Sequence, residues 1–324
     1  MKRQDKIGYG SIESSPDGGL QTFLIVILLT FFCACSDRIQ EDYTSCGLSS
    51  NRLGEYAVVP EGKLTRPGRE GEFSRSPEMS KKVSAFEIQI HEVTNQEFAE
   101  FVLETGYLTD AEKSAQSEHL DAGSALFVLP QGKPGEGAAR EDDGVGWRLL
   151  RGATWKQPEG PDSSVAGQES KPVIHVSLND ARAYARWAGA RIPTEIEWQY
   201  AANLGLFDLQ DDTSGAYDRE GDPIANTWQG VFPLFNTSED GFAGLAPVGC
   251  FVDNRIGVFD LIGNAWEWTE TPADNNAFII KGGSFLCANN FCRRYRPAAR
   301  ERQDLDFSTN HIGIRLVRDI AAKG

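Results

Sequence analysis

The second half of the chain contains very few patterns that predict regular secondary structure. Beyond Gly205 it is rich in Gly, Asp, Asn, Trp and Pro, and only residues 277–280 and 312–317 have the character of short strands. Gly and Pro interrupt helices and sheets alike, so long regular elements are not expected in this region. We therefore expect a fold in which packed loops form much of the second half of the chain.

The first half carries three clear helix starts, and we expect these to be the only helices. They begin at Thr94, Ser177 and Thr194, each followed three residues later by an acidic side chain that completes a capping box. Alternating apolar residues over 86–90 predict a strand just before the first helix. No repeat of solenoid or propeller period is present. Together these features predict one α+β domain over 57–324.

Composition and charge exclude several classes of protein. The 324 residues are 40% hydrophobic and 24% charged, which is typical of a globular protein and excludes a disordered or multi-span membrane chain. The 32 Lys and Arg residues against 47 Asp and Glu residues give a net charge of −15. A chain of this sign is not expected to bind nucleic acid through its phosphates.

The N-terminal region resembles an export signal. The run from Phe23 to Cys35 is apolar but too short to span a bilayer, so 1–35 is predicted to be a signal peptide. Cys35 follows a small residue and is similar to the lipidated cysteine of a bacterial lipoprotein; cleavage nearby without a lipid is the alternative. Residues 36–56 are polar and predict a tether. The expected location is the periplasm or cell surface of a bacterium, or else a secretory lumen, with membrane contact only through the lipid.

Six cysteines are present, and four remain if the export segment is removed: Cys46, Cys250, Cys287 and Cys292. In an oxidising compartment two disulfides are the common outcome, one of them closing the short loop from Cys287 to Cys292. The same loop geometry also suits a pair of thiolates, which are soft ligands for monovalent copper. Arginines directly after Cys292 favour the thiolate form. The sequence leaves both interpretations open.

Other familiar sites are missing from the sequence. The four histidines lack the spacing of a zinc helix or of an iron facial triad: His91, His119, His175 and His311. No Gly-rich phosphate loop, nucleophilic serine elbow or paired-carboxylate motif stands out either. Non-haem iron and phosphate chemistry are therefore disfavoured.

Several segments together resemble the formylglycine-generating enzymes, or sulfatase-modifying factors. The longest are KGGSFLCANNFCRRYRPAAR at 281–300 and VIHVSLNDARAYARWAGARIPTEIEWQYAA at 173–202, and the others, in chain order, are GYLTDAEK at 106–113, GATWKQPEGPDSS at 152–164, ANTWQGVFP at 225–233, EDGFAGLAPV at 239–248 and IGNAWEWT at 262–269. The resemblance implies a C-type-lectin-like fold with little regular secondary structure.

The same resemblance implies an activity and a set of site residues. The family's enzymes use copper and O₂ to convert a cysteine of an unfolded sulfatase, within a Cys-x-Pro-x-Arg type motif, into formylglycine. By resemblance Cys287 and Cys292 would hold Cu(I), Ser284 and Trp266 would line the oxygen-binding site, and Arg293 would contact the substrate. The implied protein is an oxidoreductase, expected to act as a monomer.

The resemblance also implies two structural calcium ions. Their expected ligands are Asn226, Thr227, Asp240 and Phe242 for one ion, and Asp260, Gly263, Ala265 and Glu267 for the other. Calcium takes six to eight hard oxygens, so it can order loops that no helix or sheet holds.

Some positions depart from the family pattern. Ala288 stands where His is usual, Phe291 replaces a Tyr, and LTRPG at 64–68 and FDLQDD at 207–212 replace familiar motifs. These changes leave the cysteine pair intact and put the substrate groove in question. A second hypothesis is therefore a non-catalytic exported module of the same fold that binds a peptide or glycan, with Cys287 and Cys292 joined in a disulfide.

Overall fold

The computed structural model describes residues 46–66, 79–116, 123–129, 146–206 and 215–320. All of these lie in the unit from Tyr43 to Gly324; a second unit, Met1–Asp42, lies outside them. The predicted export segment, the lipidation site at Cys35, His119 and the 207–212 departure therefore fall outside the described residues. Within the described residues, no helix is long and apolar enough to cross a membrane.

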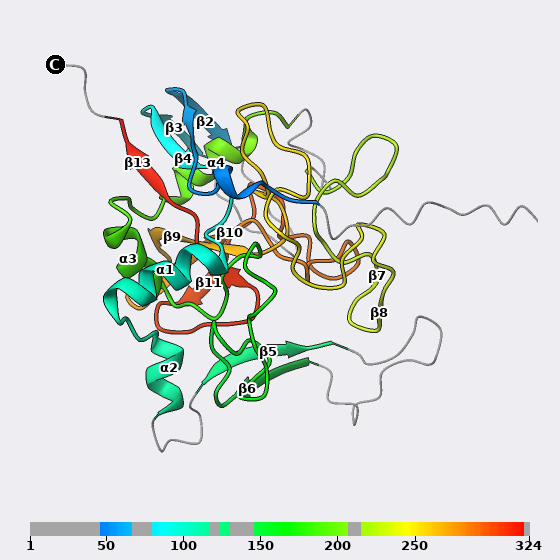
Figure 1. Cartoon of the computed structure of the whole chain (residues 1–324). Coiled ribbons are helices and arrows are strands. Elements are labelled where there is room, and N and C mark those ends of the chain that lie inside the picture. Colours follow the sequence, from blue (N-terminus) through cyan, green and yellow to red (C-terminus); the bar gives the residue numbers. More distant parts are fainter. Residues whose placement is uncertain (1–45, 67–78, 117–122, 130–145, 207–214, 321–324) are drawn as a thin grey trace, which may run out of the picture. The chain divides into compact units, whose positions relative to one another are not determined.

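Two small sheets form the centre of the fold (Figure 1). The first has the order β1-β4-β13, with antiparallel neighbours: β1 Tyr56–Val59, β4 Phe86–Gln89 and β13 Val317–Asp319. The second has the order β11-β10-β9-β12: β9 Trp266–Pro272, β10 Ala277–Lys281, β11 Glu301–Asp304 and β12 Ile312–Gly313. Here β12 runs parallel to β9, and the other neighbours are antiparallel.

Three two-stranded hairpins project from this centre. They are β2 Gly62–Arg66 with β3 Met79–Val83, β5 Ser124–Val128 with β6 Gly146–Leu150, and β7 Gly230–Val231 with β8 Phe235–Asn236. Long stretches between the strands are turns and bends, above all beyond residue 215. The prediction of a mostly irregular second half is confirmed for the described residues.

The helices begin where the capping boxes predict. They are α1 Asn95–Thr105, α2 Asp110–Ala115, α3 Leu178–Trp187 and α4 Glu195–Asn203. Both halves of the capping box are formed at Thr94, Ser177 and Thr194. The expectation of only three helices is wrong, because α2 also forms behind a capping box at Thr109. This six-residue helix buries only Ala111, so no apolar stripe announces it.

The helices cover the sheets from different sides. α1 packs on α3 through an aromatic cluster in which the Phe98 ring lies 5.7 Å from Tyr184 and 5.2 Å from Trp155. α4 contacts both the β2–β3 hairpin and the β9–β10 pair, and its Trp198 is fully buried there. Among the described residues the buried apolar side chains form three clusters; one contains the α1–α3 aromatic rings with Trp268 of β9, and another contains Trp198 of α4.

The predicted strand over 312–317 is two strands joined by a buried arginine. Residues 314–316 leave the sheet between β12 and β13, and the Arg315 side chain turns into the core with no exposed surface. It donates to both oxygens of the buried Glu267 carboxylate on β9, at 2.7 to 3.0 Å. It also donates to the carbonyl oxygens of Gln89 at 3.0 Å and Phe259 at 2.9 Å. This one side chain connects the two sheets.

The described part of the 36–56 stretch lies against the domain. Cys46 forms a disulfide with Cys250, 204 residues away in the sequence, and the Leu48 N–H donates to the Val248 carbonyl at 2.9 Å. A short 3-10 helix, η2 (Ser50–Arg52), follows before β1. A crosslink across so long a loop is of the kind that stabilises a native fold most.

Candidate functional site

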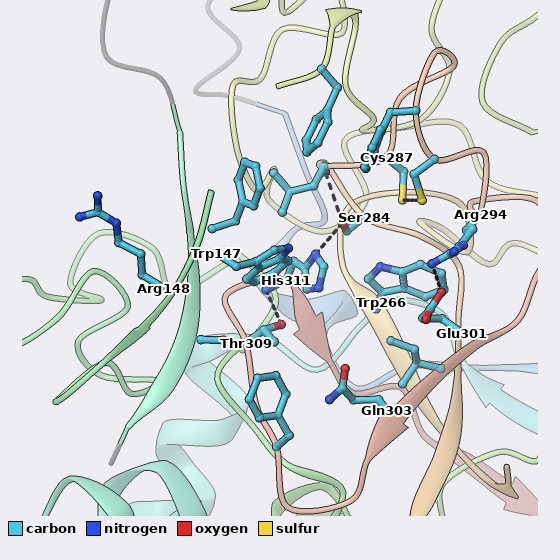
Figure 2. A pocket seen from close by; sticks show the side chains of 18 of the residues that line it. Trp147, Arg148, Trp266, Ser284, Cys287, Arg294, Glu301, Gln303, Thr309 and His311 are labelled. Atoms are coloured by element: carbon cyan, nitrogen blue, oxygen red, sulfur yellow. Dashed lines mark hydrogen bonds and ion pairs between the residues drawn. The ribbon is translucent and has the colours of Figure 1, made fainter. Parts of the chain in front are cut away.

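The site is a cavity of about 530 Å³ between the cysteine loop, the β5–β6 hairpin and the segment from β11 to β12 (Figure 2). Its walls are largely apolar. The lining residues are Ala125, Phe127, Trp147, Arg148, Leu149, Phe232, Trp266, Ile280, Ser284, Leu286, Cys287, Phe291, Cys292, Arg294, Glu301, Gln303, Phe307, Thr309 and His311. Four of the five predicted active-site residues therefore line one cavity.

Cys287 and Cys292 face each other at one side of this cavity (Figure 2). Both are free, and their sulfur atoms are 3.5 Å apart, well beyond the bond length of a disulfide. The Cys292 N–H donates to the Ala288 carbonyl at 2.9 Å, so the loop closes as a single turn between the two residues. The disulfide predicted as the alternative is not formed in this structure.

Two glycines before the cysteine loop allow its backbone to pass close to Tyr295. Gly283 has φ near +75°, and a Cβ there would lie 2.6 Å from the Cα of Tyr295. Only glycine fits so close to another backbone segment. The Gly282-Gly283 pair therefore lets the chain pass from β10 directly into the cysteine loop.

The pKa values of the two thiols are shifted in opposite directions. The hydrogen bond between them lowers the pKa of Cys292 to about 7, with help from the Arg294 guanidinium and against the effect of burial. The same hydrogen bond and burial raise the pKa of Cys287 well above its usual range. Cys292 is therefore the thiol of the pair that loses its proton first, and it is the more nucleophilic sulfur.

Ser284 and Trp266 lie next to the pair. Ser284 is fully buried; its hydroxyl oxygen accepts from the Leu286 N–H at 3.3 Å and lies 3.1 Å from Nδ1 of His311. The Trp266 indole is also buried and forms part of the cavity wall. Their placement agrees with the predicted lining of an oxygen-binding site, although that role remains a prediction.

Arg293, the predicted substrate contact, is not among the residues that line the cavity, whereas its neighbour Arg294 is. The Arg293 Nε–H donates to the Asn289 carbonyl at 2.6 Å, inside the loop. Arg294 lines the cavity and forms an ion pair with Glu301 on β11. Arg294 and Arg148 of β6 are therefore the two arginines that line the cavity among the described residues.

A row of aromatic rings in contact starts in the cysteine loop and continues along the cavity wall. The centroids of Phe291 and Phe232 are 4.8 Å apart, those of Phe232 and Phe127 5.2 Å, and those of Phe127 and Trp147 5.3 Å. The row ends on His311, 4.9 Å from Trp147. Phe291 is 56% exposed and Trp147 50%, so the row has exposed rings near both of its ends.

His311 is a site residue that sequence reasoning missed. Burial, and the nearby His175, lower the pKa of its imidazole to about 3, so the ring is neutral over the usual pH range. The sequence placed it with three other unpaired histidines. Only the fold brings it to Ser284, 27 residues away.

The first predicted calcium set fits a cation. Asn226 is buried, and its Oδ1 atom has no hydrogen-bond partner among the described residues. The nearby Asp240 carboxylate is also buried, which raises its pKa to about 6. It accepts from the N–H groups of Thr227 at 3.0 Å and Phe242 at 2.9 Å. An unpaired acceptor beside a buried carboxylate is suited to an ion that prefers oxygen ligands.

The second set needs one residue that was not predicted. Glu92, Asp260 and Glu267 are three buried carboxylates, and Arg315 is the buried cation that faces them. Burial raises the pKa of Glu92 well above its usual range, and its Oε2 atom has no hydrogen-bond partner among the described residues. Three carboxylates against one guanidinium leave two negative charges; a divalent cation would balance both, whereas a proton on Glu92 would remove one.

Neither set is a complete metal site by side chains alone. Among the described residues, no group of three or more His, Cys, Asp and Glu side chains converges on one point. The predicted ligands Gly263 and Ala265, like Thr227 and Phe242, would contribute backbone carbonyls, as calcium sites commonly require.

The chain is similar to a known protein family and to several named proteins. Residues 47–320 match the family model described as "Sulfatase-modifying factor enzyme 1-like domain". The chain belongs to this family. Proteins named formylglycine-generating enzyme are 36 to 40% identical to it. The one from Thermomonospora curvata is 40% identical over 81% of this chain and 92% of its own length.

One further relative and one solved structure set the limits of this similarity. The "Inactive C-alpha-formylglycine-generating enzyme 2" of Mus musculus is 36% identical over 76% of this chain and 81% of its own length. The structure of PvdO from Pseudomonas aeruginosa has a TM-score of 0.55 and 19% identity over 83% of this chain and 95% of that one, which shows the fold alone. The predicted family and α+β fold are confirmed. The relative named inactive is nearly as similar in sequence as those named formylglycine-generating enzyme, so the residues of the site are needed to judge activity.

The pKa values of the cysteine pair give a test in metal-free protein. We expect iodoacetamide to modify Cys292 at a rate that rises with pH around an apparent pKa of about 7, because the thiolate reacts. Cys287→Ala removes the hydrogen bond that stabilises this thiolate, so the midpoint should move to higher pH. Mass spectrometry of peptides gives both rates. Faster modification of Cys287, or a midpoint unchanged by Cys287→Ala, would contradict the assignment.

Proposed function

We propose that this protein is a formylglycine-generating enzyme that oxidises a cysteine of a sulfatase polypeptide. The observation that carries the proposal is the pair of free thiols 3.5 Å apart in the wall of an apolar cavity. A module that only binds a peptide or glycan has no need of two reduced cysteines at this place. The relatives named formylglycine-generating enzyme support the same reading.

The donor set fits monovalent copper. Cys287 and Cys292 would hold the ion, since two thiolates are soft ligands and no other sulfur, and no imidazole apart from His311, lines the cavity as described. Bound there, copper would supply the redox chemistry with O₂. The protein's own contribution is to orient the substrate and keep water out.

The side chains of the cavity can make that contribution. Trp266 and the aromatic row exclude water from the sulfur pair, and Ser284 presents a hydroxyl group beside it. Arg294 places a positive charge close to Cys292, which favours its thiolate. The cavity opens at Phe291 and Trp147, both about half exposed, so an extended peptide can reach the thiols there.

The substrate is proposed to be an unfolded sulfatase chain, because the cavity admits a peptide segment and not a folded surface. The aromatic rim favours apolar residues beside the target cysteine, and the Arg294–Glu301 pair offers a charged partner on the other wall. Phe291, a departure from the family pattern, is part of this rim. Because it is 56% exposed, Phe291 is a position at which the preferred peptide would differ from that of the relatives.

Calcium is proposed as a structural ion at both predicted places. Asn226 and Asp240 would provide side-chain oxygens at the first. At the second, Glu92 and Asp260 would do so, while Glu267 remains paired with Arg315. Export and lipidation at Cys35 complete the proposal, on the evidence of the sequence alone.

The activity is tested with the full-length, reduced protein. We expect it to bind one Cu(I) per chain and, with O₂, to convert a Cys-x-Pro-x-Arg peptide to an aldehyde that mass spectrometry and hydrazine trapping detect. Cys287→Ser and Cys292→Ser should each abolish both results. Asn290→Ser, an exposed change in the same loop, is the matched control and should keep both. Protein that binds no copper and makes no aldehyde would favour the binding module.

The calcium proposal is tested by counting ions. After dialysis against calcium and removal of free ion, we expect two calcium ions per chain by atomic emission, and one in Glu92→Gln or Asp240→Asn. Chelator should lower the melting temperature, since an ion bound only to the native state stabilises it. Glu100→Gln, exposed on α1, should behave as the wild type. If Glu92 is simply protonated, Glu92→Gln will mimic the acid and change neither ion count nor melting temperature.

A further inference from the structure

His311 is the one histidine among the described residues that lines the cavity with Cys287 and Cys292. It lies at the turn that leads into β12, where its backbone carbonyl accepts from the Trp266 N–H at 2.8 Å. Its own N–H donates to the Thr309 hydroxyl at 3.3 Å. The backbone of His311 is thus fixed to β9, the strand that carries Trp266.

The imidazole ring also has fixed contacts on two sides. Nδ1 lies 3.1 Å from the Ser284 hydroxyl oxygen, and the Trp147 ring meets the imidazole edge to face at 4.9 Å (Figure 2). The other ring nitrogen, Nε2, has no hydrogen-bond partner among the residues that the structure describes. The ring therefore has one fixed polar contact, and it is to Ser284.

We propose that His311 is a positioning residue for the oxidation, which fixes the Ser284 hydroxyl beside the Cys287–Cys292 pair through Nδ1. The Ser284 oxygen has two partners, the Leu286 N–H and the His311 ring, and together they allow the hydroxyl few orientations. Without the ring, the hydroxyl can rotate about its Cα–Cβ bond and leave the cavity wall. The expected effect on kcat rests on the proposed function.

Two simpler roles fit this ring less well. A proton acceptor would need a ring that takes up a proton near neutral pH, whereas loss of solvation lowers the pKa of this half-buried imidazole to about 3. A purely structural histidine would resemble His175, which is fully buried and uses both ring nitrogens, on the Ser124 hydroxyl at 2.7 Å and the Pro158 carbonyl at 2.9 Å. His311 instead lines the cavity and holds a residue that lines it too.

Two substitutions of the same residue separate these roles. The Asn amide occupies the place of Nδ1, and the longer Gln amide occupies the place of Nε2. His311→Asn should therefore keep the contact with Ser284, and His311→Gln should lose it. We expect His311→Gln to lower kcat for the peptide about fivefold or more, the rate equivalent of one hydrogen bond, with KM for the peptide little changed. His311→Asn should restore most of the rate.

Further variants complete the experiment in the full-length protein. Ser284→Ala should lose as much rate as His311→Gln, and the double variant should lose no more, because both remove one contact. Cu(I) stoichiometry should stay at the wild-type value in every variant. His175→Asn is the matched control, a buried histidine bonded to a serine outside the cavity; it should lower the melting temperature and leave kcat per folded molecule unchanged.

The outcomes separate this inference from the proposed function. A wild type that yields no aldehyde overturns the proposed function and the role of His311 with it. An active wild type with equal kcat in His311→Gln and His311→Asn, or with additive losses in the double variant, overturns only the inference. Nitrogen NMR of the histidine rings tests the contact without turnover: Ser284→Ala should shift the Nδ1 signal of His311, and an unshifted signal would contradict the contact.

Discussion

The buried pair between Arg315 and Glu267 is the interaction on which the rest of the structure depends. Arg315 has no exposed surface, and it donates to Glu267 on β9, to β4 through the Gln89 carbonyl and to the Phe259 carbonyl. Trp198 of α4 donates to the same carboxylate at 2.5 Å. Removing one partner of such a pair leaves a buried charge, at a cost of about 3 to 5 kcal/mol. This pair therefore connects the two central sheets with α4 and with the loop that contains Phe259.

The functional site follows from this anchor by alternation along β9. Side chains of a strand point to opposite faces, so with Glu267 turned to Arg315, Trp266 faces the cavity. β10 continues through two glycines into the cysteine loop, and β12 pairs with β9 at Trp266, which brings His311 alongside. The irregular half of the chain is therefore held by a few strand residues. Loops can carry the chemistry because their ends are fixed.

Asn264 joins the two predicted calcium regions to each other. It has a positive φ of 54°, and its side chain accepts from the Asn226 amide at 3.0 Å and donates to Glu92 at 3.1 Å. An ion at either place would therefore order the 260–265 loop, directly before Trp266. This is a physical route by which structural calcium would support a cavity that it does not touch.

The sequence predicts local features well and long-range ones poorly. Capping boxes are local, so Thr94, Ser177 and Thr194 mark helix starts correctly. The short turn that brings Cys287 to Cys292 is also local, whereas its redox state is not, and spacing alone left it open. Glu92 and His311 were missed because each gains its meaning from a partner far along the chain: Asn264 for Glu92, and Ser284 for His311.

Regular secondary structure is under-predicted for a related reason. The first four residues of β9 are all buried, so its alternation of tryptophan with a polar residue has no solvent-facing side. The buried Glu267 is explained only by partners far along the chain, Arg315 at 48 residues and Trp198 at 69 residues. The resemblance to a family supplied what the local patterns could not. It identified the site segment as a whole, and the structure shows how the fold assembles it.

The most direct test of the account is made on a sulfatase itself. The full chain is produced together with a sulfatase in a host that lacks the modification, and the sulfatase's active-site peptide is examined by mass spectrometry. The account predicts formylglycine in place of cysteine with the wild type, and unmodified cysteine with Cys287→Ser. Unmodified cysteine with the wild type, loaded with copper and supplied with O₂, would contradict it.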